Sequence, residues 1–388
     1  MTSVHPHTDQ RAGTGEPPAS GAWDPSHGAG DRLFARIGDL ALESGAVLPQ
    51  VTLAYETWGE LSPRGDNAVL VLHALTGDSH VRGPASTAHA TAGWWEDLIG
   101  PGRPVDTDRY FVVAPNVLGG CQGSTGPASL APDGRRWASR FPDLTVRDQV
   151  AAEAALMAQL GLERWALVIG GSMGGMRALE WAATLPGAVE RLAVIASGAR
   201  ASADQIAWNS AQLAAIEADG GFLGGEYYDQ PDGAGPHRGL GVARRIAHTT
   251  YRTAYELEER FGNRLQPHPD GGVQEGYPQV TSYLDHHAAK LSRRFDANSY
   301  RVLVRAMNSH DLGRGRGGTA AGLGRITART LVVAIESDRL FPLPLVEEIR
   351  DGVPGSTWRV ESSPIGHDAF LVTNPHLERW ITHLLEDG

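Results

Sequence analysis

The chain has 388 residues, of which 41% are hydrophobic and 20% charged, a composition typical of a globular protein that buries a large core. Its formal net charge of −11 argues against a general binder of nucleic acids or anionic membranes, because neutralising phosphates needs clustered positive charge. Cys121 is the only cysteine, so no intramolecular disulfide can form and a reducing compartment is expected.

Residues 1–30 are rich in Gly, Pro, Ser and His, and this composition predicts a disordered leader without a packing role. The segment lacks the apolar core of a signal peptide. No run in the chain approaches the roughly 18 apolar residues of a membrane span. We therefore expect a cytoplasmic protein.

Strand patterns dominate the first third of the chain after this leader. Segments 33–37, 40–42 and 51–57 alternate as antiparallel strands do at the edge of a sheet. Segments 68–73 and 110–115 are nearly continuous apolar runs instead. Such runs predict strands in a sheet that is covered on both faces.

Helices then begin to alternate with buried strands. A helix is expected over 145–160, because its apolar residues fall on one face, and it leads into a buried strand at 166–169. A further buried strand is expected at 192–196, sheet character returns at 330–335, and a short strand is expected at 358–360. This alternation predicts an α/β protein with a mostly parallel, doubly wound sheet.

The alternation is interrupted by a long stretch without a convincing buried strand. Helical patterns dominate there, and we interpret the stretch as an inserted helical cap over residues 198–325. The expected core then consists of residues 31–197 and 326–388. The helices expected in the cap and after it cover 202–218, 241–261, 281–295, 298–308, 343–350 and 375–385.

A glycine-rich turn joins the strand at 166–169 to the next helix. Ser172 lies at its apex, and the pattern Gly170-x-Ser172-x-Gly174 between a strand and a helix is typical of a nucleophile elbow. Side chains two residues on either side of such a serine would collide, which glycine avoids. The following helix also directs unpaired N–H groups at the serine, as acyl transfer needs.

A nucleophilic serine needs a base, and the base needs a group that holds its tautomer. In this fold the order is serine, acid, histidine, each after a later strand. Asp338 and His367 fit that order. Asp338 could instead only cap the following helix. His367 is identified as the base by its position, because the other histidines after Asp338, His376 and His383, lie in the terminal helix.

Two backbone N–H groups should stabilise the oxyanion of the tetrahedral intermediate. One donor is expected at Met173, directly after the nucleophile, and the other at Leu75, in the loop that follows the strand at 68–73.

Three weaker features point elsewhere. The arginine–glycine segment 313–318 resembles an RNA-binding motif, but one copy in an acidic chain favours a loop, with a phosphate contact as the alternative. His286 and His287 could be metal ligands, although a solvated helix face is the simpler interpretation. No glycine-rich loop contains a lysine, which excludes a Walker-type phosphate loop.

Six ordered motifs together resemble the homoserine O-acetyltransferase family, from about Leu33 to the C-terminus. This resemblance implies an α/β-hydrolase fold with a helical cap. The motifs are HALTG from His73, NVLGGCQGSTGP from Asn116, FPDLTVRD from Phe141, GGSMGGMRALEW from Gly170, SDRLFP from Ser337 and GHDAFL from Gly366.

The resemblance also implies a ping-pong reaction in which Ser172 takes an acetyl group from acetyl-CoA and passes it to the hydroxyl of L-homoserine. Arg244 would hold the substrate carboxylate and Asp368 its ammonium group, with a hydrogen bond from Tyr251. Arg245 is the alternative binding arginine, and Asp368 could only orient its loop. The resemblance implies acetyl-CoA as co-substrate, no bound cofactor or metal, and a homodimer formed through the cap.

Other activities remain open at this stage. Relatives with nearly the same motifs use succinyl-CoA as donor or L-serine as acceptor. A serine esterase or other hydrolase would use the same three residues, and a catalytically inactive binding protein could share the fold. The presence of Ser172, Asp338 and His367 argues against the last of these.

Overall fold

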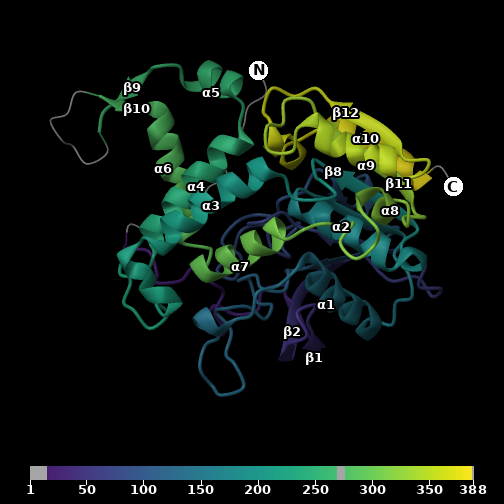
Figure 1. Ribbon diagram of the computed structural model, residues 1–388, viewed down its shortest axis with the longest axis horizontal. Helices are drawn as coiled ribbons and strands as arrows, with labels where there is room; N and C mark the ends of the chain where they lie inside the picture. The colour runs from purple at the N-terminus through teal and green to yellow at the C-terminus, as the bar shows by residue number, and fades with distance from the viewer. Residues whose placement is uncertain (1–14, 269–275, 387–388) are drawn as a thin grey trace.

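The computed structural model describes residues 15–268 and 276–386, and a twisted eight-stranded sheet forms its centre (Figure 1). The strand order is β1-β2-β6-β3-β7-β8-β11-β12. β1 and β2 are antiparallel, β2 and β6 are antiparallel, and the other pairs are parallel, so the expected α/β architecture is confirmed. The strands are β1 (Leu33–Ala41), β2 (Val47–Trp58), β3 (Ala68–Leu72), β6 (Phe111–Pro115), β7 (Leu167–Gly171), β8 (Arg191–Ile195), β11 (Arg329–Ile335) and β12 (Thr357–Glu361).

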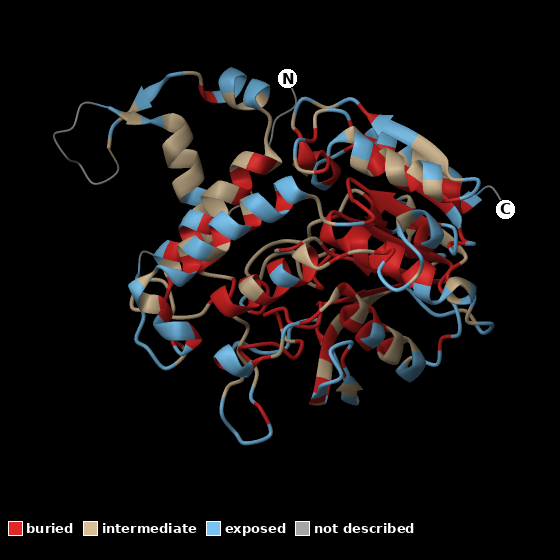
Figure 2. Ribbon diagram, in the orientation of Figure 1, coloured by how far each residue is buried: buried red, intermediate tan, exposed pale blue. Residues whose placement is uncertain are grey.

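The central strands are buried on both faces, as their continuous apolar sequences require (Figure 2). In β3, Leu70 and Leu72 point into one hydrophobic cluster while Val69 and Val71 point into the other. Successive side chains of a strand alternate between faces, so one apolar run supplies two cores.

Helices cover both faces of this sheet. Residues of α1, α2 and α9 belong to one hydrophobic cluster, whereas α10 contributes to the cluster on the opposite face, together with Trp95. The helices are α1 (Val146–Gln159), α2 (Met173–Thr184), α9 (Leu343–Gly352) and α10 (Pro375–Glu386). Shorter elements lie along the rest of the chain: β4 (Ile99–Gly100) and β5 (Val105–Asp106) between β3 and β6, and the 3₁₀ helices Ala138–Arg140, Pro186–Ala188 and Gly220–Gly225.

The region between β8 and β11 is mainly helical, as the sequence predicts. Its helices α3 to α6 stand beside the sheet (Figure 1). The exact bounds of core and cap stay a prediction. The elements are α3 (Ala203–Glu217), α4 (His237–Tyr251), α5 (Ala254–Phe261), α6 (Gln279–Ser292), α7 (Ala297–Asn308), α8 (Thr319–Leu323) and the short strands β9 (Leu265–Gln266) and β10 (Tyr277–Pro278).

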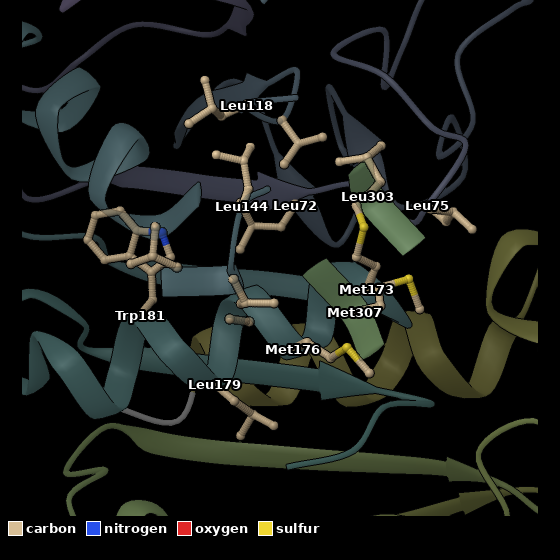
Figure 3. Packing of buried hydrophobic residues seen from close by; sticks show 14 of the residues in the cluster. Leu72, Leu75, Leu118, Leu144, Met173, Met176, Leu179, Trp181, Leu303 and Met307 are labelled. Carbon is tan, nitrogen blue, oxygen red and sulfur yellow. The ribbon is translucent and has the colours of Figure 1, made fainter. Parts of the chain in front are cut away.

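Helix α7 packs directly on the core. Its residues Leu303 and Met307 lie beside Met173 and Met176 of α2 (Figure 3), and all four belong to one hydrophobic cluster. The base of the cap and the helix after Ser172 therefore share one core.

One predicted helix is divided in two. The helical pattern at 241–261 is interrupted after Tyr251, where Arg252 is extended and Thr253 begins α5 as its N-cap, accepting a hydrogen bond from the backbone N–H of Glu256. The T-x-x-E spacing at this point is a known signal of a helix start. The break brings the chain back toward the core.

Residues 15–30 differ from the predicted leader, whereas residues 1–14 lie outside the described part of the chain. The backbone N–H of Gly21 donates to the carbonyl of Phe295, and that of Trp23 donates to the carbonyl of Cys121. Ser20 Oγ donates to the buried Asp296 at 2.8 Å. Composition alone missed these long-range contacts, so the expectation of no packing role is corrected for this part.

None of the helices within residues 15–268 and 276–386 is both long enough and apolar enough to cross a lipid bilayer.

Candidate active site

Ser172 occupies a strained turn between β7 and α2. Its φ of 56° and ψ of −124° lie in a region that costs a residue with a side chain about 1–3 kcal/mol. Two hydrogen bonds hold the turn: the Ser172 N–H donates to the Ile195 carbonyl at 3.0 Å, and Ser197 Oγ donates to the Ser172 carbonyl at 2.8 Å. The neighbouring strand β8 and the loop after it thus fix the serine.

The glycines of the elbow are required by close backbone contacts. A Cβ atom on Gly174 would lie 2.0 Å from the carbonyl oxygen of Leu72, and one on Gly170 would lie 2.3 Å from the carbonyl oxygen of Gly174. Neither position has room for a methyl group. The end of β3, the end of β7 and the start of α2 therefore approach one another as the sequence pattern requires.

Asp338 and His367 are hydrogen-bonded to each other. Asp338 follows β11 and His367 begins the 3₁₀ helix His367–Leu371 after β12, so both lie at the carboxyl ends of parallel strands. His367 Nδ1 donates to Asp338 Oδ2 at 2.6 Å. Asp338 Oδ1 accepts the backbone N–H groups of Leu340 and Phe341, at 2.8 and 2.9 Å. These bonds leave Nε2 as the basic nitrogen of His367.

The surroundings of His367 adjust its basicity. Burial alone would lower the pKa of this imidazole, but the charge and hydrogen bond of Asp338 together with the charge of Asp368 outweigh it and raise the pKa above its usual value. The ring of Phe341 stacks on His367 at 5.2 Å, and that of Phe370 meets it edge-on at 5.6 Å. These contacts fix the plane of the ring.

Ser172 lies near the His367 turn but does not bond to it in this structure. A Cβ on Gly171 would lie 2.5 Å from the ring of Phe370, which itself packs on His367, so the elbow and this turn touch. Among the described residues Ser172 Oγ has no hydrogen-bond partner. Such catalytic bonds are often long in free enzymes and shorten when substrate binds.

The backbone N–H groups of Leu75 and Met173 donate no hydrogen bond to any described residue. Met173 is the first residue of α2, and Leu75 lies in the loop after β3. His73 anchors that loop: its Nδ1–H donates to the Ala74 carbonyl at 2.7 Å, and its Nε2 accepts from Val117 N at 3.0 Å. Burial lowers the pKa of His73 to about 3, which keeps it neutral. Both N–H groups are available to an anion.

Arg244 of α4 has no carboxylate partner among the described residues. Its Nη1 contacts Thr76 Oγ1 at 3.4 Å, and its Nε is buried without a hydrogen bond. The guanidinium lies 5.5 Å from the ring centre of Tyr251, which in turn lies 5.7 Å from the ring of His367. By contrast, the alternative candidate Arg245 forms an ion pair with Asp285. An unpaired guanidinium is suited to a substrate carboxylate.

Asp368 is paired within the protein, which the sequence analysis missed. Its Oδ2 lies 3.4 Å from Nε of Arg252, the residue in the break between α4 and α5. The T-x-x-E pattern that starts at Thr253 was the available signal for this break.

The described residues contain one group of four side chains that could hold a metal ion: Asp31, Glu56, His80 and His89. The two imidazole rings stack at 3.8 Å with only 14° between their planes. A metal ion binds in the plane of an imidazole, and parallel stacked rings share no plane. Both oxygens of Glu56 accept hydrogen bonds, from Ser79 and from His80. The group is therefore a hydrogen-bonded network rather than a metal site.

The two weaker sequence features take ordinary roles. The segment 313–318 is a loop whose arginines form ion pairs, Arg314 with Glu43 and Arg316 with Glu180. These pairs oppose the alternative of a phosphate contact.

His287 packs against His248 and Tyr283, with ring centres 4.0 and 4.6 Å apart, while His286 is exposed. Burial lowers the pKa of His287 to about 3.

Comparison with known proteins places the chain in a family. The family described as alpha/beta hydrolase fold matches residues 67–373. The homoserine O-acetyltransferase of Thermobifida fusca (strain YX) is 58% identical over 370 residues, covering 95% of this chain and 97% of that protein. The chain belongs to the homoserine O-acetyltransferase family. The resemblance indicated by the six motifs is thereby confirmed, and the enzyme class is acyltransferase.

Solved structures agree with this placement. The homoserine O-acetyltransferase from Bacillus anthracis has a TM-score of 0.81 at 25% identity, covering 92% of this chain and 96% of that one. Esterase E22 has a TM-score of 0.83 at 26% identity, covering 92% and 99%. The homoserine O-acetyltransferase family thus shares its architecture with an ester hydrolase.

The elbow geometry predicts that Gly174→Ala is destabilising. The added methyl group would collide with the Leu72 carbonyl, so the ends of β3 and α2 must separate, and we expect a loss of about 1–3 kcal/mol in the free energy of unfolding. Urea unfolding monitored by circular dichroism measures this change in the free energy of unfolding. Gly187→Ala is the matched control, because a Cβ there meets nothing within 4 Å. Equal stability of the two variants would contradict the steric account.

The pair of His367 and Asp338 predicts a double effect of Asp338→Asn. Removing the charge of Asp338 leaves only the charge of Asp368 to oppose burial, so the pKa of His367 falls and the acidic limb of the pH–rate profile moves to lower pH. At the same time the amide favours the wrong tautomer, and the plateau rate should fall by about 10⁴. The rate of acylation by p-nitrophenyl acetate, measured as a function of pH, reports both the shift of the acidic limb and the fall of the plateau rate. An unchanged acidic limb would show that Asp338 does not control His367.

Proposed function

We propose that this enzyme transfers an acetyl group from acetyl-CoA to the hydroxyl of L-homoserine, through an ester on Ser172. Its close relatives bear the name of that activity. The product would serve methionine synthesis. The chemistry needs only a serine, a histidine, a carboxylate and two N–H donors, so the proposal includes no bound cofactor or metal.

In the first half-reaction Ser172 Oγ attacks the thioester carbonyl while its proton passes to Nε2 of His367. The N–H groups of Leu75 and Met173 would then bind the oxyanion, an interaction whose loss typically costs about 10²–10³ in rate. Collapse of the tetrahedral intermediate breaks the carbon–sulfur bond. The CoA sulfur takes the proton from His367, and Ser172 carries the acetyl group.

In the second half-reaction the acceptor hydroxyl gives its proton to the same nitrogen of His367 and attacks the acetyl ester. Collapse of this second intermediate returns the proton to Ser172 Oγ and releases the acetylated amino acid. Asp338 stabilises the imidazolium that forms in both steps.

One observation supports a carboxylate-bearing acceptor in particular. Arg244 has an unpaired guanidinium, and it lies between Thr76 of the loop that carries Leu75 and Tyr251, which packs on His367. A site that used only water as acceptor would have no need of this cation. With Arg244 on the carboxylate and Asp368 near the ammonium group, homoserine would present its hydroxyl toward the acyl group.

Hydrolysis is the second candidate, because the solved esterase E22 shares this architecture. The two activities differ only in what accepts the acyl group. Arg244, which has no carboxylate partner among the described residues, favours transfer to an amino acid, since it adds a binding site that water does not use.

The proposal extends to the setting of the reaction. We place it in the cytoplasm, where acetyl-CoA is available, and we expect a homodimer that forms through the cap helices. The buried, unpaired thiol of Cys121 is compatible with a reducing environment.

The first test is mass spectrometry of the intact enzyme with acetyl-CoA and, separately, with succinyl-CoA. We expect an acetyl adduct on Ser172 that homoserine removes faster than serine or buffer does. Ser172→Ala should form no adduct and lose about 10⁶ in turnover, as serine enzymes of this type do. A succinyl adduct, or removal by serine as fast as by homoserine, would overturn the proposed substrates.

The second test separates the half-reactions in Arg244→Ala. The unpaired cation binds the acceptor carboxylate, so we expect the KM for homoserine to rise about 10- to 100-fold, as for loss of a charged hydrogen bond. Release of CoA in the first half-reaction should stay measurable. Arg245→Ala is the matched control, because its charge is already paired with Asp285. Equal losses in both half-reactions would contradict a role in acceptor binding.

A further inference from the structure

The carboxylate beside the catalytic histidine shares its nearest cation with a second carboxylate. Arg252 Nε lies 3.4 Å from Asp368 Oδ2, and Arg252 Nη1 lies 3.6 Å from Glu256 Oε1. The three side chains are only 15 to 16% exposed. The guanidinium therefore lies between two carboxylates in a partly enclosed cluster.

Neither contact of Arg252 is a good hydrogen bond. Its Nε is buried and has no hydrogen-bond partner, and Oε2 of Glu256 is likewise buried without one. Arg260 also reaches Glu256 Oε1, at 3.4 Å, but its side chain is 44% exposed, so solvent screens that attraction. Glu256 thus retains an acceptor oxygen that a small movement of Arg252 could satisfy.

The backbone around the cluster is firmly held. A Cβ on Gly366, which has a φ of 93°, would lie 2.8 Å from the carbonyl oxygen of Tyr251, and Thr253 Oγ1 donates to the carbonyl of Pro364 at 2.5 Å. The break between α4 and α5 is thus packed on the turn that carries His367. Arg252 can exchange partners by side-chain rotation alone, while the backbone stays in place.

We infer that Arg252 is a positioning residue that holds Asp368 in the free enzyme and transfers to Glu256 when the α-ammonium group of the acceptor binds Asp368. This inference rests on the proposed function and deepens it. The exchange keeps the charges of Arg252, Asp368 and Glu256 paired before and after binding, which matters where solvent is partly excluded. An acceptor that lacks an ammonium group leaves Arg252 on Asp368, so only amino-acid acceptors bring about the exchange.

The inference predicts opposite effects of two neutral substitutions. Arg252→Gln removes the competitor for Asp368, so the KM for homoserine should fall about two- to fivefold. Glu256→Gln removes the second partner of Arg252, which then holds Asp368 more firmly, so this KM should rise by a similar factor. In the double variant the effect of Glu256→Gln should vanish, because no guanidinium remains to be redirected.

Two further measurements separate exchange from a structural role. With 4-hydroxybutyrate, which lacks the ammonium group, the preference for homoserine should increase in Arg252→Gln and decrease in Glu256→Gln. Arg252→Lys, which retains the charge, should remain close to the wild type. Glu259→Gln, an exposed position on the same helix α5, is the matched control for the loss of a negative charge.

The outcomes are distinguishable. A rise of the homoserine KM in both variants, or equal slowing of CoA release and acceptor acetylation, would mean that Arg252 only supports the turn, and would overturn the inference. The wild-type enzyme is assayed in parallel with acetyl-CoA and homoserine. If the wild-type enzyme transfers no acetyl group, the proposed function itself is contradicted. If it transfers the group but the two variants shift the KM for homoserine in the same direction, only the partner exchange of Arg252 is contradicted.

Discussion

The contact on which this structure depends is the close approach of three backbone segments at the elbow. The end of β3, the end of β7 and the first turn of α2 meet where Gly174 faces the carbonyl of Leu72 at a distance that admits no side chain. This approach forces Ser172 into a strained conformation and brings the N–H of Met173 to the same edge of the sheet as the loop of Leu75. The strained turn is held by a hydrogen bond from Ser172 to β8 and one from Ser197 to Ser172, so Ser172 is positioned before any substrate binds.

The helical region between β8 and β11 contributes charged side chains around this elbow. Arg244 and Arg252 come from the same stretch of the cap, yet only Arg252 has carboxylate partners among the described residues. The break after Tyr251 explains the difference, because it turns Arg252 toward the His367 loop and leaves Arg244 beside Thr76. An unpaired cation and an exchangeable ion pair in one site are suited to a zwitterionic acceptor. Ester hydrolysis requires neither.

The sequence was sufficient to predict a feature where the local residue pattern and the chain topology both point to it. The placement of Ser172, Asp338 and His367 at strand ends could be predicted, because parallel strands present their carboxyl ends at one edge; the catalytic role of each residue stays a proposal. Contacts between residues far apart in the chain could not be predicted from the sequence. Composition could not indicate that residues 15–30 pack on the segment that contains Phe295, and helical periodicity did not reveal the break at Thr253. The partner of Asp368 followed from that break and was missed with it.

The central claim is that the acyl group on Ser172 goes to an amino-acid hydroxyl and not to water. Related folds carry out both reactions, so architecture does not decide between them. The most direct measurement isolates the enzyme carrying a radiolabelled acetyl group, mixes it with homoserine or with buffer alone, and determines how the label partitions. The account predicts that homoserine captures nearly all of the label as its O-acetyl ester. Release of free acetate at the same rate with and without homoserine would contradict it.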